Sequence, residues 1–565
     1  MEKLYKISLY AVKFLTLLLA VLLFAGSFLT TCYADNMETQ QVLFRLDNPL
    51  WNLLELAGFG LLFCACLHFY DKFGRKFRRG LLIFTLGFIF CLGVLLILFG
   101  RTVPAADAMS VYNAALEWIQ GNLDVIHPTV SYLSYYPQQI GLMAFLELFL
   151  RIWNLTGISA PAWHFIKLIY VCLLCAAVLF QYLSLKYLWR EHWEEISCCY
   201  LLLVCCNLPM IMYSSFVYGE IPSYAALSVG LYLLLRLLSG MTFPGQASDI
   251  SCKGMSVKPS ASEASSETLL SPKLHCTRSA FFTGTGSILF LALSVMLRKN
   301  SLIPIIAVLL VLLFESLRFG RSVRARLCLL GMAVCLAVTS VGILPLVQKC
   351  YEKKAGNTLS SGVTAMSYFA MGMQEASRGC GWYNGFNIDT YDAAGMDSAL
   401  ANEISRQAVL ERLAYFRGHP GYAVDFYARK HLSQWADGTY ASRQATLAAY
   451  GGRSGFFQKV YDGSLSSAYI EWCNAWQNVL YLGTLVFCVS AVHRKRKNTA
   501  TAPQGSDTDS LYLSLYLYVG LIAVLGGFLF HILWEANSRY IFLYSLLLMP
   551  YCAAGIYTVF AEHAK

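Results

Sequence analysis

The chain has 565 residues, of which 57% are apolar and only 13% are charged. Soluble domains have about 25% charged residues, so this composition excludes a soluble enzyme, a DNA-binding protein, a disulfide scaffold and a disordered chain. The net charge of +10 then describes how the chain is oriented in a membrane and does not indicate a nucleic-acid partner.

Apolar segments of about 17 to 23 residues follow one another along the chain, and this is the length that a helix needs to cross a membrane. There are thirteen, at about 8–30, 50–70, 80–100, 137–154, 164–185, 197–217, 221–239, 281–297, 301–317, 327–347, 475–492, 511–531 and 540–560. Within the first segment, the apolar run of about Val12–Thr30 adjoins the basic start of the chain (Lys3, Lys6 and Lys13) and is typical of a signal anchor, although residues 32–34 would serve as a weak cleavage site.

Lysine and arginine in short loops mark the cytoplasmic side. The loops 71–80, 315–326 and 493–498 carry four or five of them each and are predicted to be cytoplasmic. The loops 31–49 and 101–130 carry one base and three acids each and are predicted to lie outside. Six apolar segments lie between the outer residue 101 and the inner residue 318, but only an odd number of crossings joins opposite sides. One of the six therefore does not cross.

The segment 137–154 is the best candidate for the one that does not cross. It begins with Pro137, which favours a first helical turn, and it carries Glu147 and Arg151, a pair that lipid would seldom tolerate. We expect an amphipathic helix in the outer interface; the alternative is that 137–154 spans and another segment re-enters. The all-α chain then has about twelve transmembrane helices and both ends inside.

The crossings divide the chain into four parts: two N-terminal spans in 1–79, a seven-span part in 80–347, one large extracytoplasmic loop in 348–474, and C-terminal spans in 475–565. The seven-span part has an outer loop at 101–163 and a serine-rich cytoplasmic loop at 240–280, which is predicted to be disordered. In the large loop, the WYNGFN stretch at 382–387 fits either an acceptor site or core packing.

Most of the cysteines lie in apolar runs, where a thiol behaves as a small apolar group. Only Cys32, Cys350, Cys380 and Cys473 fall in the outer loops, and the sequence leaves open whether any of them pair.

In this topology, four loops that are far apart in the sequence place acids and bases on the outer side. These polar residues are Asp107, Glu220, Arg298, Lys299, Asn300, His531, Glu535, Asn537 and Arg539. Polar groups at membrane depth are costly and usually functional, so this set is the candidate site.

Asp107 lies in the first turn of an expected amphipathic helix that begins at Pro104 and is stopped by Gly121 and Asn122. The helix dipole favours an ionised carboxylate there, and such a group can accept a proton from a hydroxyl nucleophile. The alternative is that Asp107 only caps the helix.

Arg298, Lys299 and Arg539 are predicted to hold a phosphate or pyrophosphate, which arginine binds through two parallel hydrogen bonds. The alternatives are snorkelling to lipid headgroups and pairing of Arg539 with Glu535 at i,i+4 spacing. His531 and Glu535 have ligand-like spacing, but two groups do not make a metal site, so no metal ligand is assigned and a divalent cation is left open.

A carboxylate, several cations and an approach from the membrane suit the transfer of a sugar from a lipid phosphate. Because phosphate is a good leaving group, the reaction needs a base for the acceptor and cations for the departing phosphate, but little general acid. Glycoside hydrolysis differs, since its poor leaving group requires a second, protonated carboxyl group. A single displacement inverts the anomeric carbon.

Five short motifs carry a family resemblance: RTVPAADAMSVYNAA at 101–115, YYPQQIG at 135–141, SSFVYGEIP at 214–222, LRKNSLIP at 297–304 and HILWEANSRYIF at 531–542. With them the sequence resembles the GT-C superfamily of integral-membrane glycosyltransferases, of the bacterial, protein-mannosyltransferase-like kind. The resemblance covers about 80–350 and 511–560. It implies a seven-span module with membrane-lying helices in its first outer loop and a large loop after the seventh span.

The resemblance also implies roles for individual residues. Asp107 resembles the catalytic base, and the substrate-binding positions are Glu220 as a second acid near the donor sugar, Arg298, Lys299 and Arg539 as donor-phosphate contacts, and Glu535 and Tyr540. The first loop has one acid where many relatives have an adjacent pair, and two spans precede the module, so the catalytic assignment depends on Asp107 alone.

The expected activity is transfer of a sugar from a polyprenyl-phosphate donor to an acceptor glycan, protein or lipid at the outer face of a bacterial plasma membrane. Which sugar and which acceptor stay open. One alternative is a transporter or flippase for a lipid-linked saccharide, which would place ionisable residues at mid-membrane within broken helices. Another is a polymerase or ligase of surface polysaccharide, which would use a lipid-diphosphate donor.

Overall fold

The computed structural model describes residues 2–34, 39–242, 278–318, 321–501 and 514–563. Within them, eleven helices are long and apolar enough to cross a membrane. They are α1 (Glu2–Leu29), α2 (Pro49–Phe73), α3 (Arg75–Leu95, continued by a π-helical turn at Leu96–Gly100), α7 (Trp163–Leu188), α10 (Glu220–Thr242), α11 (Arg278–Leu297), α12 (Leu302–Ser316, after a 3-10 turn at Lys299–Ser301), α13 (Val323–Ala355), α20 (Ser466–Thr501), α22 (Val519–Leu533, after a 3-10 turn at Leu515–Tyr518) and α23 (Ser538–His563).

A twelfth apolar segment is bent. It consists of α8 (Trp193–Cys206) and α9 (Leu208–Met212, continued by a 3-10 turn at Tyr213–Ser215), which meet at an angle of 63°. Asn207 lies at the break and its side chain accepts a hydrogen bond from the backbone of Met210 at 3.1 Å, while Pro209 has no N–H to continue the first helix. Counted as one span, this pair brings the total to twelve, and the spans match the predicted crossings one for one.

The segment 137–154 is not among the eleven. It forms a 3-10 turn at Pro137–Gln139 and α6 (Ile140–Leu155), and the 16 residues of α6 rise only about 24 Å, less than the hydrocarbon core of about 30 Å. The predicted pair Glu147–Arg151 is formed at 2.7 Å, and Glu147 also accepts a hydrogen bond from Tyr351 of α13. Its location in the membrane interface stays a prediction.

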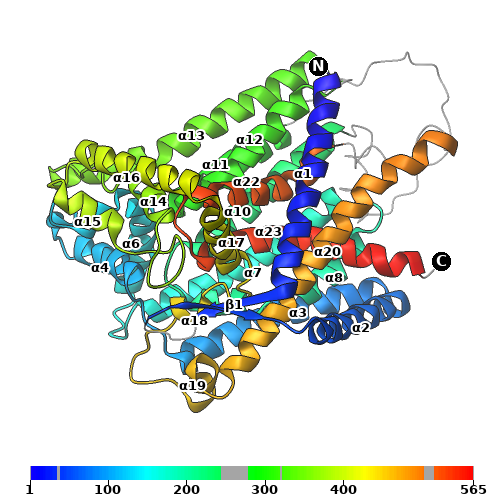
Figure 1. Cartoon of the computed structure of the whole chain (residues 1–565), viewed down its shortest axis with the longest axis horizontal. Helices are drawn as coiled ribbons and strands as arrows, with labels where there is room; N and C mark the ends of the chain where they lie inside the picture. Colours follow the sequence, from blue (N-terminus) through cyan, green and yellow to red (C-terminus); the bar gives the residue numbers. More distant parts are fainter. Residues whose placement is uncertain (1, 35–38, 243–277, 319–320, 502–513, 564–565) are drawn as a thin grey trace.

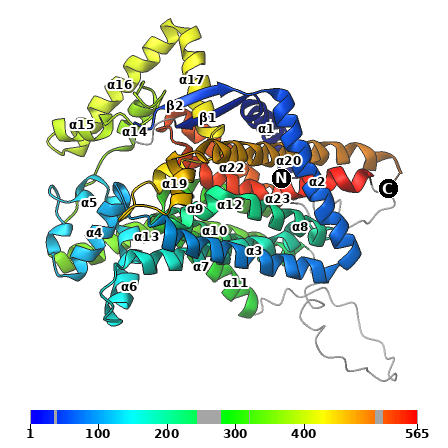
Figure 2. The same cartoon turned by 90° about the horizontal axis from the view of Figure 1, so that it is seen from below.

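The remaining helices surround one end of the bundle. They are α4 (Asp107–Ile119), a 3-10 turn at Leu123–Val125 and α5 (Tyr132–Tyr135) in the loop after α3, and α14 (Ala365–Gly372), α15 (Phe386–Ala393), α16 (Ser398–Gly418), α17 (Pro420–Trp435), α18 (Ser442–Ala445) and α19 (Gly455–Asp462). We call residues 356–465 the loop domain. It is shorter than the predicted loop 348–474, because α13 continues to Ala355 and α20 begins at Ser466. In both views α4, α15 and α16 lie at the left, away from the C-terminus (Figures 1 and 2).

A small antiparallel hairpin follows α1. Its strands β1 (Thr30–Ala34) and β2 (Val42–Leu46) pair with Cys32 opposite Phe44, and Cys32 donates its backbone N–H to the carbonyl of Ala436 in the loop domain at 2.9 Å. The all-α prediction is therefore confirmed except for this hairpin, which connects the N-terminal spans to the loop domain.

Arginines of two predicted cytoplasmic loops, 71–80 and 315–326, form ion pairs with acids. Arg78 of the first loop lies 3.4 Å from Glu194 of α8. Glu315, fully buried at the end of α12, pairs with Arg321 at 2.7 Å and accepts hydrogen bonds from the Tyr5 hydroxyl and the Leu515 backbone. The 3-10 turn before α22 and the start of α1 are therefore both hydrogen-bonded to Glu315 at the end of α12. The predicted disordered loop 240–280 lies almost entirely outside the described residues, at 243–277.

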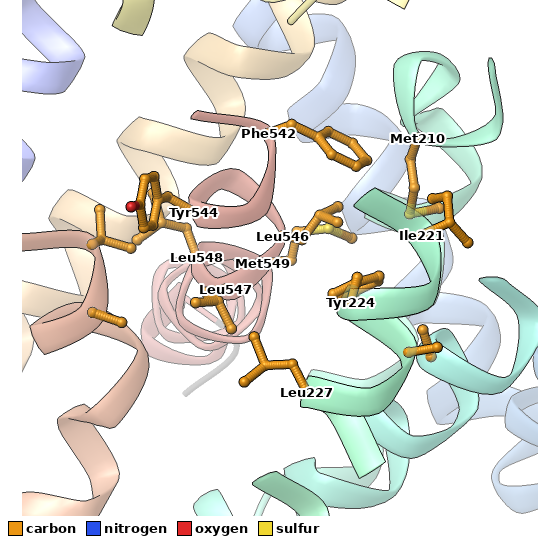
Figure 3. Packing of buried hydrophobic residues seen from close by; sticks show 14 of the residues in the cluster. Met210, Ile221, Tyr224, Leu227, Phe542, Tyr544, Leu546, Leu547, Leu548 and Met549 are labelled. Carbon is orange, nitrogen blue, oxygen red and sulfur yellow. The ribbon is translucent and has the colours of Figure 1, made fainter. Parts of the chain in front are cut away.

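The bundle core lies between α23 and the α9–α10 segment. Figure 3 shows Phe542 and Met549 of α23 on one side of this interface and Met210, Ile221 and Tyr224 on the other, all buried. Lipid tails are as apolar as these side chains, so the hydrophobic effect does not drive the helices together inside a membrane. Close packing and hydrogen bonds between helices hold such bundles together instead.

Gln181 of α7 supplies hydrogen bonds of this kind. Its amide donates to the carbonyl of Leu546 at 2.8 Å and accepts from the hydroxyls of Tyr200 at 2.8 Å and Tyr224 at 2.6 Å. Gly555 of α23 lies so close to α20 that a Cβ there would be 1.8 Å from the carbonyl oxygen of Gly483. Four helices are thus fixed around α23, whose N-terminal end carries part of the site described below.

We predict that the bent pair α8–α9 is a single crossing. A reporter inserted at Gly157, between α6 and α7, should then report the opposite side of the membrane from one inserted near Ser262, because three crossings separate them. A reporter after Lys565 should agree with the one near Ser262, since six described spans lie between. If α8–α9 is re-entrant instead, the reporters at Gly157 and Ser262 will be found on the same side.

Candidate active site

A cavity of about 930 Å³ lies at the end of the bundle that the loop domain covers. Its walls come from the start of α4, the segments around residues 216–218 and 298–300, the turn between α22 and α23, and the loop domain. Six of the seven predicted site residues line it, namely Asp107, Arg298, Lys299, Glu535, Arg539 and Tyr540. The structure therefore brings together residues that are up to 433 positions apart in the sequence.

Asp107 is the first residue of α4. The helix begins three residues later than predicted from Pro104, because Ala106 has a positive φ of 47° and takes the N-cap position. No side-chain hydrogen bond caps the helix, so the interpretation of Asp107 as a simple cap is not what the structure shows. Gly121, with φ of 91°, follows the helix end as predicted. The half-buried carboxylate of Asp107 faces the cavity at the positive end of the helix dipole.

The segment that leads to Asp107 is held on two sides. Lys167 of α7 donates from Nζ to the carbonyl oxygen of Thr102 at 2.7 Å. The backbone N–H of Val103 donates to Ala448 of the loop domain at 2.9 Å, and Tyr450 donates back to Arg101 at the same distance. The position of Asp107 consequently depends on both the membrane bundle and the loop domain.

Glu220 joins the two arginines of the site. Its Oε1 lies 3.0 Å from Nη2 of Arg298 and 3.7 Å from Nε of Arg539, and only 4% of its side chain is exposed, against 13% and 19% for the arginines. Glu220 is not among the cavity-lining residues, so it lies behind the guanidinium groups. From there a single carboxylate neutralises part of their mutual repulsion and orients both toward the cavity.

The backbone around Glu220 requires a glycine. A Cβ on Gly219 would lie 2.5 Å from the carbonyl oxygen of Leu297, so only glycine lets the turn before α10 pack against the turn that carries Arg298. Next to it, the ring of Tyr218 lies 5.4 Å from the Arg298 guanidinium and 5.6 Å from that of Arg539. The turn at 218–220 and the turn at 298–300 are thus packed against each other. We call Arg298, Lys299 and Arg539 the cationic wall of the cavity, and the ring of Tyr218 adds an aromatic surface to it.

The alternative pairing of Glu535 with Arg539 is not formed. Because α22 ends at Leu533 and α23 begins at Ser538, the residues between them are not helical and i,i+4 spacing does not bring these side chains together. Arg539 pairs with Glu220, and Glu535 accepts a hydrogen bond from the Tyr540 hydroxyl at 3.2 Å.

Glu535 is a buried carboxyl group on the cavity wall. Its pKa is raised to about 7, chiefly by burial and to a smaller extent by the negative charge of Asp107, while Arg539 and the Tyr540 hydroxyl act to lower it. Asp107 is more accessible. Asp107 and Glu535, two of the carboxyl groups that line the cavity, are therefore in different environments, which is a common basis for different roles in catalysis.

The turn that carries Glu535 is fastened to the loop domain. Lys430 of α17, fully buried, donates from Nζ to the carbonyl oxygens of Gly372 at 2.5 Å and Ile532 at 2.9 Å. Ser538 donates to the buried carboxylate of Asp437 at 2.6 Å. These contacts fix the last site turn against the loop domain.

Most of the aromatic and amide residues of the cavity were not predicted from the sequence. They include Tyr136, Tyr218, Tyr368, Tyr383, Trp534, Gln138, Asn387 and Gln444, together with Arg378 and with Tyr33 and Gln40 of the hairpin segment. In the WYNGFN stretch, Trp382 is buried in a small apolar cluster, as the core-packing alternative predicts, while Tyr383 and Asn387 line the cavity; the acceptor site stays a prediction. The unusual density of aromatic and amide residues in this stretch was the only local signal in the sequence that these residues line the cavity.

His531 is fully buried, and its ring stacks on that of Tyr540 at 5.8 Å. Within the residues that the structure describes, no three histidine, cysteine, aspartate or glutamate side chains are placed to hold a metal ion together. The cysteines of the predicted outer loops, Cys32, Cys350, Cys380 and Cys473, are all free thiols in the structure.

No protein-family model and no curated protein matches the sequence. Among solved structures, the chain is similar to the archaeal oligosaccharyltransferase AglB from Archaeoglobus fulgidus in complex with an inhibitory peptide and a dolichol-phosphate, with a TM-score of 0.44 and 13% identity over 87% of this chain and 51% of that one. It is also similar to the oligosaccharyltransferase of that organism in its apo form, with a TM-score of 0.43, 12% identity and coverage of 87% and 51%. The chain spans about half the length of these proteins.

Proposed function

We propose that the protein is a membrane glycosyltransferase of the GT-C kind, which moves a sugar from a polyprenyl-phosphate donor to an acceptor hydroxyl at the extracytoplasmic face. One observation carries the proposal: a carboxylate at a helix N-terminus and three cationic side chains, Arg298, Lys299 and Arg539, line one cavity at the end of a bundle of apolar helices.

In this reaction the acceptor hydroxyl gives its proton to Asp107, and its oxygen forms a bond to the anomeric carbon of the donor sugar. The bond between that carbon and the phosphate oxygen breaks, and the phosphate leaves with the electron pair. Arg298, Lys299 and Arg539 stabilise the charge on the departing phosphate, and Tyr540 and Glu535 lie beside it. Attack on the face opposite the phosphate inverts the anomeric centre.

A lipid-linked saccharide transporter is the second candidate, because α8–α9 is a bent segment of the sort found in transporters. However, Asn207 at the bend is fully buried and its side chain already bonds Met210. The paired cations and carboxylates lie instead at one end of the bundle, which favours chemistry at that end.

The direct test is to incubate the protein in lipid nanodiscs with radiolabelled polyprenyl-phosphate hexoses and measure the release of free polyprenyl phosphate. We expect release to depend on time and protein. Release only from polyprenyl-diphosphate saccharides would favour the polymerase or ligase alternative. Movement of intact donor between leaflets, with no release of the sugar, would favour a transporter and contradict the proposal.

The raised pKa of Glu535 predicts a pH dependence of donor binding. Below pH 7 the group is mostly protonated and neutral; above pH 7 it adds a negative charge beside the cations that hold the phosphate. A phosphodiester donor keeps its single charge over this range, so its KM should rise about three- to tenfold between pH 6 and pH 8. Glu535→Gln should keep the low KM at both values, whereas an equal rise in wild type and variant would contradict this role.

A further inference from the structure

The cavity has a second wall that the proposed chemistry does not use. This wall, which we call the amide–aromatic wall, is formed by Tyr136, Tyr383 and Asn387 with Gln138, Tyr368 and Trp534. Tyr368 and Trp534 stack at 4.7 Å between ring centroids and are nearly parallel, at 11°. The wall therefore combines flat aromatic faces with side-chain amides, and it is contributed by the first loop, the loop domain and the turn before α23.

One polar atom of the wall lacks a partner. Asn387 is only 1% exposed, and within the described residues its Oδ1 accepts no hydrogen bond. A buried acceptor without a donor costs about 1 to 3 kcal/mol, so such atoms are rare in finished structures and point to a missing donor. Asn387 is one of the residues that line the cavity, so this acceptor lies just behind the cavity surface, where a small rotation of the side chain lets a hydroxyl group of a bound ligand supply the donor.

The wall lies beside the carboxylate that we assign as the base. Burial raises the pKa of Tyr136, the negative charge of Asp107 and the Tyr383 hydroxyl raise it further, and a hydrogen bond with Asn387 lowers it. Tyr136 therefore lies near Asp107, Tyr383 and Asn387, which line the same cavity. A ligand that rests on the wall can present a hydroxyl to Asp107.

We infer that the acceptor is a glycan and that the amide–aromatic wall binds the sugar ring whose hydroxyl is glycosylated; this inference rests on the proposed function. A pyranose ring has apolar C–H faces that cover aromatic rings, and hydroxyl groups that both donate and accept hydrogen bonds. Asparagine, glutamine and tyrosine have the same dual capacity, so a few of them satisfy the ring hydroxyls. A peptide serine would offer one hydroxyl and leave most of these groups unused.

The wall is held in place by hydrogen bonds between the elements that carry it. The hydroxyl of Tyr135 donates to Asp392 at 2.7 Å, which fixes α15, the helix that carries Asn387, against the first loop. The indole of Trp382 donates to Ser433 at 2.8 Å and fixes the start of the WYNGFN stretch against α17. The amide–aromatic wall is thus preorganised, which lowers the cost of ordering it on binding.

The test measures transfer from a polyprenyl-phosphate hexose to three labelled acceptors in parallel: oligosaccharides of hexose and N-acetylhexosamine, serine- and threonine-containing peptides, and diacylglycerol. We expect the oligosaccharides to be glycosylated. Asn387→Leu and Trp534→Leu should each raise the KM for the oligosaccharide about tenfold or more while the KM for the donor changes much less. Asn402→Ala, which alters an exposed amide of α16, is the matched control and should behave as wild type.

The outcomes separate the inference from the proposed function. Transfer to the peptides or to diacylglycerol in preference to the oligosaccharides would overturn the inference and leave the proposed function standing. Equal oligosaccharide KM values in wild type, Asn387→Leu and Trp534→Leu would also overturn it. If no polyprenyl phosphate is released with any acceptor or with water, the proposed function itself fails.

Discussion

Replacement of Asp107 by asparagine is expected to lower the rate of sugar transfer by about 10²- to 10⁴-fold, the usual contribution of a general base. Asparagine has the same shape but cannot accept the acceptor's proton, so the hydroxyl must attack without activation. The side chain is half-buried and does not cap α4, so folding should be preserved. The measurement is the turnover number at saturating donor and acceptor, together with the thermal midpoint of the purified protein.

A matched control lies on the same helix. Glu117 is exposed near the end of α4 and does not line the cavity, so Glu117→Gln should leave transfer unchanged. The KM for the donor should change little in Asp107→Asn, because the base contacts the acceptor hydroxyl and not the phosphate. Turnover close to wild type in Asp107→Asn, with normal protein levels, would remove Asp107 from the role of base.

The second large effect is expected for the buried ion pairs behind the cationic wall. Arg539→Gln should lower kcat/KM for the donor by about 10²- to 10³-fold, because loss of one member of a buried charged pair costs about 2 to 5 kcal/mol. Glu220→Gln should act in the same direction, since without its carboxylate the two guanidinium groups repel each other and lose their orientation. The measurement is steady-state kinetics with the donor varied.

The pairing itself is tested by combining the two substitutions. Because Glu220 and Arg539 are in contact, the double variant should lose less than the sum of the single losses. Arg539→Lys should recover only part of the activity, since lysine cannot form two parallel bonds to a phosphate. Arg406→Gln removes an arginine from an exposed pair with Glu403 and serves as the control. Strictly additive effects would mean that Glu220 does not position Arg539.

The predictions that succeeded concern local properties. The length of each apolar run determines whether a helix can cross the membrane, and every predicted crossing corresponds to a described helix or to the bent pair. Charge parity required that one of six segments does not cross, Pro137 and the Glu147–Arg151 pair selected 137–154, and α6 is too short to be counted as a span. The exception is the start of α4, because the positive φ of Ala106 has no signature in the residue type.

The site was predicted only in part, for a physical reason. Charged residues near membrane depth are rare, so Asp107, Arg298 and Arg539 could be selected from the sequence by their scarcity. Aromatic and amide residues are common in any large loop, so Tyr383 and Asn387 could not be distinguished from core residues without their neighbours.

The sequence by itself therefore determined the class of protein and the approximate place of each span. Both depend on properties of short stretches of sequence, namely the scarcity of charged residues and the length of each apolar run. Only the tertiary structure decided which charges pair. Arg539 has Glu535 four residues away, yet its partner is Glu220, more than 300 residues distant, because the turn between α22 and α23 is not helical and directs Arg539 toward the start of α10. Ion pairs and cavities depend on distance in space, and distance along the chain does not specify them.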